Sequence, residues 1–562
     1  MNISYQNTIL LNLRLQSIPT DSQILRITGV IIAAKMSGLA GLDRKAMELE
    51  RLARVSRKRL LETTIDKDDV EIETEEKKRQ RITDLSIPNH LCQGLPKTER
   101  TNSSIEARYN SKISPLCSSS LSHPINEKIK LGVQYPNGVI KKTWAQGFSR
   151  KGDDISIEEV LQKDDLTLAV LSAFQIDTRW ILGKLSDKTR VYWVLQAKTD
   201  DEKQEWMSQA SSMYKFCFPS MRGNIRCMHS KLQLLAHPSH LRIVVPTANL
   251  VSYDWGENGI MENMVFLIDL PRLENNQTLA LEDLTNFGKE LTFFLEAKGL
   301  PENVITSLRK FDFSRTNNIG FVHSIGGSHT GSLLNRTGFC GLASTINQLG
   351  LKKSDPILID FITASLGNIS PKFIETLYTA AQGTLELPPI KSQNNSSTNK
   401  KSALRECVNN FCRIYFPSRK TVESSLGGLG AGGTICFQSR WWSSNHFLQH
   451  IIRDCKSRRQ GMLMHSKLWF VRSQKPCSQH AWAYIGSANL SESAWGRVSM
   501  DKNTKKPRIN CANWECGVIF PAKSNHNKVD EEMAEFVDSI PVPMIAPGDS
   551  YEGKVPWFFC ER

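Results

Sequence analysis

The stretch that decides the fold is MHSKL at residues 228–232, which recurs letter for letter at residues 464–468. Each copy is followed by a similar second segment, TANL at residues 247–250 and SANL at residues 487–490. A tryptophan then follows at the same offset from each asparagine, as Trp255 and Trp495. An identical pentapeptide with matching downstream residues indicates an internal duplication of one structural unit.

The pattern around both motifs predicts strands. Residues 229–234 (HSKLQL) alternate polar and apolar side chains, which predicts that His229 and Lys231 face one side of a strand. Residues 468–471 (LWFV) are typical of a buried strand, as are residues 241–246 (LRIVVP) and 481–486 (AWAYIG). Because α/β proteins commonly place reactive groups at strand ends, we expect both copies to build one site.

Strand-like and helical runs alternate from about residue 155 onward, which favours an α/β architecture. Residues 156–163 and the segment around Trp180 are predicted helices, while residues 166–173 and 190–195 are predicted strands. A polar run at residues 391–401 (KSQNNSSTNKK) predicts an exposed insertion loop. The duplication predicts two similar halves, residues 150–327 and 328–562, each a mixed β-sheet flanked by helices, with the site at their pseudo-twofold seam.

Residues 1–125 differ from the rest in composition. They are rich in charge and, towards residue 124, in Ser, Asn and Pro, which predicts a disordered tail. The basic clusters at residues 57–59 (RKR) and 77–79 (KKR) are either nuclear-import or nucleic-acid contacts, or solvated linker charge. A mitochondrial transit peptide within residues 1–35 and a second start at Met36 both stay open.

The composition limits the function classes. The chain has 562 residues and a net charge of +14, which suggests more than one core and a polyanionic partner. No apolar run is long enough to cross a bilayer, so a soluble protein is expected. Thirteen cysteines without a CxxC pair predict free thiols in a reducing compartment, not a zinc site. The glycine-rich residues 427–433 lack the Lys-Ser/Thr ending of a phosphate-binding loop, so no nucleotide cofactor is expected.

The duplicated residues suit the chemistry of a phosphodiester. Two lysines and two asparagine amides can stabilise negative charge on the phosphoryl oxygens in the transition state. One imidazole can attack phosphorus while the other protonates the leaving oxygen. The residues are His229, Lys231 and Asn249 in the first copy and His465, Lys467 and Asn489 in the second.

Duplicated H-x-K…N resembles the phospholipase D superfamily. Typical members also carry an Asp five positions after the Lys, where this chain has Ala236 and Arg472. With PTANL and GSANLSESAWG, this departure resembles the tyrosyl-DNA phosphodiesterase branch, which lacks that Asp. The resemblance covers residues 155–557, including IYFPS at 414–418, AGG at 431–433 and NWECG at 513–517.

The resemblance implies roles for these residues. His229 would be the nucleophile that forms a phosphohistidine with the 3′ end of DNA, and His465 the general acid and then the base. Glu515 would orient a catalytic histidine, and its counterpart for the other histidine would be Asn258, with Glu262 and Asn263 as alternatives. The lysines and asparagines would bind the phosphate, and further substrate contacts would come from Ser365, Ser425 and Ser487.

The resemblance also implies a DNA repair enzyme without a metal ion or other cofactor. Its substrate would be single-stranded or nicked DNA with a 3′-phosphotyrosyl end left by a topoisomerase peptide, or another adduct. The expected protein is a monomer in the nucleus, with a mitochondrial pool still open, and it has no membrane partner.

Three alternatives make different demands on the sequence. A phospholipid hydrolase or phosphatidyltransferase should carry an interfacial amphipathic segment, and none is evident. A non-catalytic DNA-binding module would not need two complete sets of His, Lys and Asn. A metal-dependent nuclease should place carboxylates beside the histidines, and the sequence clusters none there.

Overall fold

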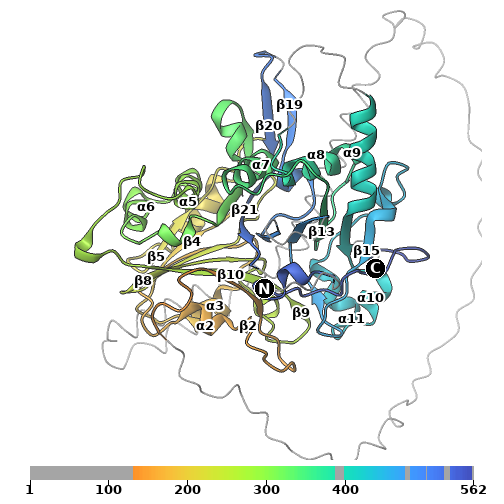
Figure 1. Ribbon diagram of the computed structural model, residues 1–562. Coiled ribbons are helices and arrows are strands. Elements are labelled where there is room, and N and C mark those ends of the chain that lie inside the picture. The colour runs from red at the N-terminus through yellow and green to blue at the C-terminus, as the bar shows by residue number, and fades with distance from the viewer. Residues whose placement is uncertain (1–130, 386–397, 475–480, 502, 524–531, 560–562) are drawn as a thin grey trace, which may run out of the picture. The chain divides into compact units, whose positions relative to one another are not determined.

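The computed structural model describes residues 131–385, 398–474, 481–501, 503–523 and 532–559 (Figure 1). The predicted tail at residues 1–125, its basic clusters and Met36 lie outside these ranges. Within the described ranges no helix is long and apolar enough to span a membrane. All nine cysteines placed there are free thiols.

The first half of the molecule is built on a mixed sheet with the strand order β2-β1-β10-β8-β7-β3-β4-β5. Strands β3, β4 and β5 run parallel, whereas β1, β10, β8, β7 and β3 pair antiparallel along the sheet. The strands are β1 (Val139–Thr143), β2 (Asp154–Ile155), β3 (Leu168–Ser172), β4 (Arg190–Val194), β5 (Tyr214–Cys217), β7 (Leu232–Ala236), β8 (His240–Pro246) and β10 (Met264–Pro271). The helices are α2 (Ile157–Leu161), α3 (Thr178–Lys184), α4 (Asp200–Met207), α5 (Asn286–Ala297) and α6 (Glu302–Leu308).

The second half repeats this plan. Its sheet has the order β11-β21-β18-β17-β13-β14-β15, which matches β1-β10-β8-β7-β3-β4-β5 strand for strand, with the same parallel and antiparallel pairs. The strands are β11 (Gly320–Ser324), β13 (Ile357–Ile362), β14 (Cys412–Phe416), β15 (Ile452–Asp454), β17 (Leu468–Ser473), β18 (Trp482–Gly486) and β21 (Asn513–Pro521). The helices are α7 (Gly338–Gln348), α8 (Pro371–Ala381), α9 (Thr398–Phe411), α10 (Arg419–Glu423), α11 (Gly428–Ala431), α12 (Ser439–Trp442) and α13 (Glu492–Trp495). The duplication in the sequence is therefore a duplication of the fold.

The two sheets pack against each other. Ile243 and Phe266 of the first sheet share one apolar core with Phe470 and Val518 of the second, and α5 contributes to the same core. The outer face of the first sheet is covered by α2 and α3, and that of the second by α7 and α8 (Figure 1). Burial on both faces explains why β18 and the part of β8 that follows Arg242 are continuous apolar runs.

Two short strand pairs join the two halves by backbone hydrogen bonds. Strand β6 (Cys227–Met228) of the first half pairs with β21 of the second, with Met228 opposite Trp514. Strand β9 (Met261–Glu262) pairs with β16 (Leu463–Met464), with Glu262 opposite Met464. Each histidine motif thus begins on a strand that is hydrogen-bonded to the opposite half.

The structure corrects the predicted boundaries. Strand β1 belongs to the first sheet although it precedes residue 150, and β11 belongs to the second sheet although it precedes residue 328. The lysines within VIKKT hide β1 from an apolar pattern, because their side chains occupy half-buried positions. Of the predicted loop at residues 391–401, residues 398–401 begin α9, and residues 391–397 lie outside the described ranges.

Candidate active site

The two HSK segments are short extended connections, not parts of strands. Residues 229–231 link β6 to β7, and residues 465–467 link β16 to β17. The prediction of one strand through residues 229–234 is wrong. Before residue 229 the chain pairs with β21 of the second half, and from Leu232 onward it pairs with β3 of its own sheet, so the strand is interrupted between them. The backbone N–H of His229 donates to Trp514 O at 2.9 Å, and that of His465 donates to Glu262 O at 3.0 Å.

The His229 ring is held in one orientation. Its Nδ1 lies 2.9 Å from Oε2 of Glu515, and the histidine side chain is 12% exposed. Donation from Nδ1–H to the carboxylate leaves the lone pair on Nε2, which lies 3.5 Å from Nζ of Lys231. The ring of Phe174 contacts the imidazole, with centroids 5.2 Å apart. This arrangement suits Nε2 to act as a nucleophile.

The charge state of His229 follows from its surroundings. Burial lowers the pKa of the imidazole below its ordinary value, and the nearby charges of Lys231 and Lys467 lower it further. Glu515 opposes these effects, since its carboxylate favours the protonated ring. The net shift favours a neutral imidazole near pH 7, the form that has a free lone pair.

His465 has a similar arrangement. Its Nδ1 lies 3.1 Å from Oδ2 of Asp254, and Nζ of Lys467 donates to the carbonyl oxygen of His465. Burial and the charge of Lys467 lower the pKa of His465 to about 4, against the opposing effect of Asp254. Each imidazole therefore has a carboxylate at Nδ1 from the other half.

Asp254 takes the position that the sequence assigned to Asn258. Asn258 is exposed, and its Oδ1 accepts from the backbone N–H of Ile260 at 3.3 Å, so it does not orient His465. Asp254 is fully buried at the 3-10 helix η1 (Ser252–Trp255), and its Oδ2 also accepts from the backbone N–H of Asn249 at 2.7 Å.

The two alternatives to Asn258 lie behind the site. Glu262 is buried, accepts from Ser457 Oγ at 2.6 Å and pairs with Arg459 at 3.1 Å. The Asn263 side chain accepts from Thr247 Oγ1 at 2.8 Å, and its amide donates to the carbonyl oxygen of Asp254 at 2.9 Å. Asn263 thus supports the residue that contacts His465.

Both site asparagines are held by their oxygens. Asn249 Oδ1 accepts from the backbone N–H of Gln175 at 3.2 Å. Asn489 Oδ1 accepts from the backbone N–H of Ala364 at 3.2 Å and from Thr363 Oγ1 at 3.1 Å. With the oxygen engaged, the amide hydrogens are the end that can donate to an anion.

The two sets share one electrostatic environment. The charge of Lys467 lowers the pKa of His229, and the charge of Lys231 lowers that of His465. Both lysines are fully buried, and burial lowers their own pKa values; at Lys467 the charge of Lys231 adds to the effect. Two buried cations without a bound anion repel each other, so this centre favours a negatively charged ligand.

The three predicted serine contacts occupy different places. Ser365 lies beside the site, because its backbone N–H donates to the Thr363 hydroxyl that holds Asn489. Ser487 is fully buried and donates to Glu515 Oε2, so it supports that carboxylate from behind and does not face a substrate. Ser425 donates to Val422 O at 2.7 Å within its own turn, and the structure does not bring it to the histidines.

Sequence reasoning missed Asp254, Thr363 and Phe174. The repeat did not mark Asp254, because the residue directly before the second tryptophan, Trp495, is Ala494. Among the described residues, no group of three or more His, Cys, Asp or Glu side chains is arranged to hold a metal ion.

Comparison with known proteins gives the family. The family model for tyrosyl-DNA phosphodiesterase matches residues 139–552, well over half of the chain. The chain belongs to the tyrosyl-DNA phosphodiesterase family.

The matching relatives are distant in sequence. The chain is 25% identical to tyrosyl-DNA phosphodiesterase 1 of Arabidopsis thaliana over 394 residues, which cover 65% of this chain and 58% of that protein. It is 26% identical to the Drosophila melanogaster protein of the same name over 379 residues, 65% of this chain and 63% of that protein. The chain thus spans about three fifths of the length of these relatives.

A solved structure supports the fold. The crystal structure of yeast tyrosyl-DNA phosphodiesterase matches 75% of this chain and 100% of that chain, with a TM-score of 0.55 and 16% identity. At this identity the match establishes the fold of two packed, similar halves.

Proposed function

We propose that this protein is a DNA repair phosphodiesterase that removes tyrosine, or another adduct, from a DNA 3′-phosphate. The observation that carries the proposal is the pair of imidazoles, His229 and His465, each with Nδ1 on a buried carboxylate and both beside the same two buried lysines. Membership of the tyrosyl-DNA phosphodiesterase family supports the choice of substrate.

In the first step, Nε2 of His229 attacks phosphorus. A bond from nitrogen to phosphorus forms, and the bond from phosphorus to the tyrosine oxygen breaks. The negatively charged phosphate beside His465 favours its protonated form, and this imidazolium gives its proton to the leaving phenolate, so tyrosine departs neutral. The lysine ammonium groups and the amides of Asn249 and Asn489 stabilise the charge on the phosphoryl oxygens. The product is a phosphohistidine that links the protein to the 3′ end of the DNA.

In the second step, water replaces His229. His465 is now neutral and takes a proton from the water as it attacks phosphorus. The bond between Nε2 and phosphorus breaks, and a DNA 3′-phosphate is released. His465 regains the proton that it lost in the first step, so the cycle closes.

The remaining features of the proposal concern the partners. The substrate is single-stranded or nicked DNA that carries a topoisomerase-derived tyrosyl peptide, and the enzyme acts as a monomer. The basic clusters at residues 57–59 and 77–79 favour localisation in the nucleus, and they are compatible with a further pool in mitochondria. Neutralising both clusters in a fluorescent fusion of the full chain should reduce nuclear accumulation, and unchanged accumulation would remove this support.

The decisive experiment uses an oligonucleotide with a 3′-phosphotyrosine. The full chain is expected to release tyrosine and leave a 3′-phosphate, both in buffer with excess EDTA and without it. His229→Ala should be inactive under the same conditions. Strict dependence on added Mg²⁺, or cleavage at an internal phosphodiester, would overturn the proposal.

A further inference from the structure

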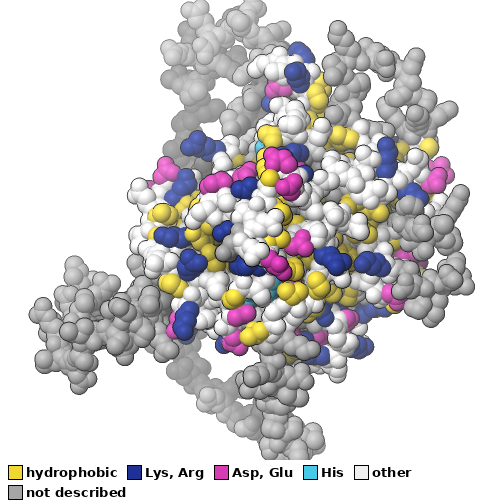
Figure 2. Space-filling model, turned by 60° about the vertical axis from the view of Figure 1, so that its left-hand side comes forward, with side chains coloured by type: hydrophobic (Ala, Val, Ile, Leu, Met, Phe, Trp, Pro, Cys, Tyr) yellow, Lys and Arg dark blue, Asp and Glu magenta, His cyan; other side chains and the backbone are white. Residues whose placement is uncertain are grey.

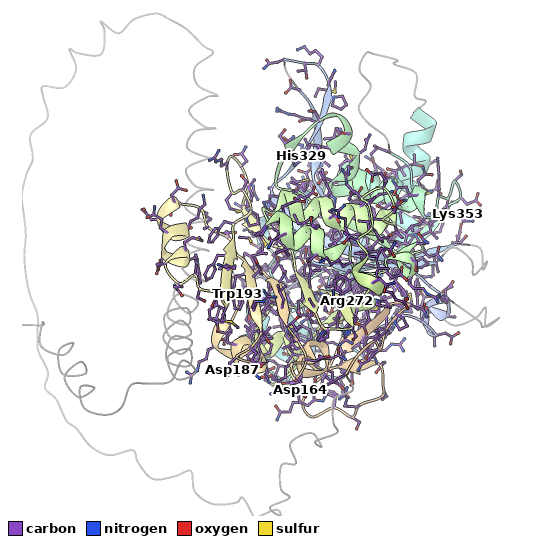
Figure 3. The ribbon with its side chains drawn as sticks, turned by 90° about the vertical axis from the view of Figure 1, so that its left-hand side faces the viewer. Asp164, Asp187, Trp193, Arg272, His329 and Lys353 are labelled. Atoms are coloured by element: carbon purple, nitrogen blue, oxygen red, sulfur yellow. The ribbon has the colours of Figure 1, made fainter. Side chains whose placement is uncertain are left out.

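A β-hairpin at residues 497–511 is inserted between two site residues, Asn489 and Glu515. It consists of β19 (Arg497–Met500) and β20 (Pro507–Cys511), and the short strand β12 (Gly327–His329) pairs with β20 at residues 509–511. Figure 1 shows β19 and β20 at the top, reaching beyond the second sheet, and Figure 3 labels His329 near their foot. The outer part of the hairpin therefore extends past the strand that anchors it.

The hairpin has two different faces. Its register sets Arg497 opposite Asn510 and Ser499 opposite Arg508, so these four side chains share one face. The other face carries Val498, Met500, Pro507 and Ile509, of which Ile509 is fully buried in the second core. On the polar face, Arg508 Nε and Asn510 Nδ2 both donate to Ser499 Oγ, at 3.4 and 3.0 Å.

The outward charge of the hairpin is positive. Its described residues carry four Lys or Arg and one acid, Asp501, and Lys502 lies outside the described ranges. Asp501 is used within the turn, because it accepts from Thr504 and pairs with Arg508 at 3.1 Å. Lys505 and Lys506 are exposed at the tip. The Arg497 side chain is 72% exposed and lies 3.8 Å from the carboxylate of Glu492, which precedes the hairpin. Figure 2 shows Lys and Arg side chains at the tip of the same projection.

The residues that flank the hairpin contact the chain just before the His229 motif. Arg226, three residues before His229, donates through its backbone N–H to Ala512 O at 2.6 Å. Its guanidinium donates to Ser493 Oγ at 3.3 Å, and the Arg226 side chain is exposed. Exposed cations thus lie just before the His229 motif, at the foot of the hairpin and at its tip, as Arg226, Arg497, Lys505 and Lys506.

We propose that the polar face of this hairpin and its exposed tip bind phosphates of the DNA strand whose 3′ end occupies the active site. The inference deepens the proposed function and rests on it for the identity of the substrate. Lys and Arg on a strand ribbon contact phosphates without reading bases, so binding here lends affinity but no sequence preference. Strands of four to five residues extend about 15 Å, enough to reach phosphates several nucleotides from the reacting one.

The test replaces the exposed cations that do not pair within the hairpin. The variant Arg497→Ser/Lys505→Ser/Lys506→Ser is compared with the control Lys163→Ser/Lys188→Ser/Arg190→Ser, which also removes three exposed charges. The control residues lie far from His229 along the sheet. Leu232, just after the His229 motif, pairs with Ser172 at the end of β3, whereas Arg190 pairs with Leu168 at the start of β3. Figure 3 labels Asp164 and Asp187, their chain neighbours, at the bottom, opposite His329.

The hairpin variant should raise KM about tenfold for a tyrosyl oligonucleotide of about twenty nucleotides, with kcat unchanged. A tyrosyl dinucleotide is too short to reach the hairpin, so its kcat/KM should not change. The control variant should match the unaltered chain on both substrates. Equal effects on the long and short substrates, or no effect on either, would overturn the inference. An effect that follows the length of the peptide adduct instead would assign the hairpin to the protein side of the substrate.

Binding of an unmodified oligonucleotide separates this inference from the proposed function. Fluorescence anisotropy at several salt concentrations needs no turnover, so it reports on the hairpin even if tyrosine is never released. Each phosphate contact on a single strand adds about 0.7 to the salt slope of log Kd, so loss of three contacts should lower it by about 2. An unchanged slope in the hairpin variant would refute the inference while leaving the catalytic proposal intact.

Discussion

His465 in the second half donates its Nδ1–H to Asp254 in the first half over 3.1 Å, and His229 mirrors this bond with Glu515 at 2.9 Å. The two carboxylates do not occupy equivalent positions in the two halves. Met228 pairs with Trp514, and Met464 pairs with Glu262, so the residue equivalent to Glu515 is Asn263. The carboxylate on His465 comes instead from η1, and the Asn263 amide supports it through the carbonyl oxygen of Asp254.

The charge of Asp254 should matter most for a poor leaving group. Asp254→Asn keeps an oxygen for the imidazole but removes the charge that raises the pKa of His465, so less of the general acid is protonated near pH 7. Turnover of a 3′-phosphotyrosyl oligonucleotide should fall about 100-fold, and turnover of a 3′-nitrophenyl phosphodiester much less. Asn258→Ala is the control, since Asn258 is exposed and should not affect either substrate. An equal loss on both substrates would show that Asp254 only maintains the fold.

The catalytic unit should be independent of the N-terminal residues. Every strand of the two sheets lies at or after β1, which begins at Val139. A chain that begins at Asn126 should therefore turn over a short tyrosyl oligonucleotide at a rate close to that of the full chain. The measurement is kcat on that substrate, with circular dichroism to verify folding. A folded but inactive truncation would place a required residue within the first 125.

Acid should destabilise the protein through a stacked histidine pair. His237 and His240 are fully buried, with ring centroids 4.4 Å apart, and burial together with the charge of His237 lowers the pKa of His240 to about 4. An unfolded histidine has a pKa of about 6.5, so the unfolded state binds more protons in between. This contribution of His240 to stability is fully present above about pH 6.5 and is lost as the pH falls towards 4.

The lowered pKa of His240 corresponds to a loss of about 3 kcal/mol in the free energy of unfolding between the pKa of the unfolded and that of the folded state. Urea denaturation of the full chain and of His240→Gln at about pH 7.5 and about pH 5 provides the measurement. Other buried histidines act in the same direction, so the difference between the two proteins is the informative quantity. The variant should lose less stability on acidification, and an identical loss would show that His240 does not contribute.

Much of the fold was predictable because its buried strands are short runs rich in apolar, β-branched and aromatic residues. The predictions for residues 166–173, 190–195, 241–246 and 481–486 are confirmed by β3, β4, β8 and β18. The crossed pairs of β6 with β21 and of β9 with β16 were not predictable. Each pair joins opposite halves over two residues only, so no local periodicity indicates it.

The active site likewise contains residues that could be predicted from the sequence and one that could not. The histidines, lysines and asparagines were visible from their repetition, and so was Glu515 from its neighbours. Asp254 was not, because its contact with His465 depends on how η1 folds and on the pairing of β9 with β16. The resemblance assigned this role to Asn258 instead, four residues further along the chain.

The last prediction separates the roles of the two histidines. His229→Ala removes the nucleophile, so no covalent protein–DNA species should form with any substrate. His465→Ala retains Nε2 of His229 but lacks the base that activates water for the second step. A nitrophenol leaving group needs little protonation, so it should still depart, and the phosphohistidine should accumulate. Denaturing electrophoresis should show a slower band whose mass equals protein plus oligonucleotide, and acid should cleave it, as expected for a bond between phosphorus and nitrogen. Accumulation in His229→Ala and not in His465→Ala would reverse the two assignments.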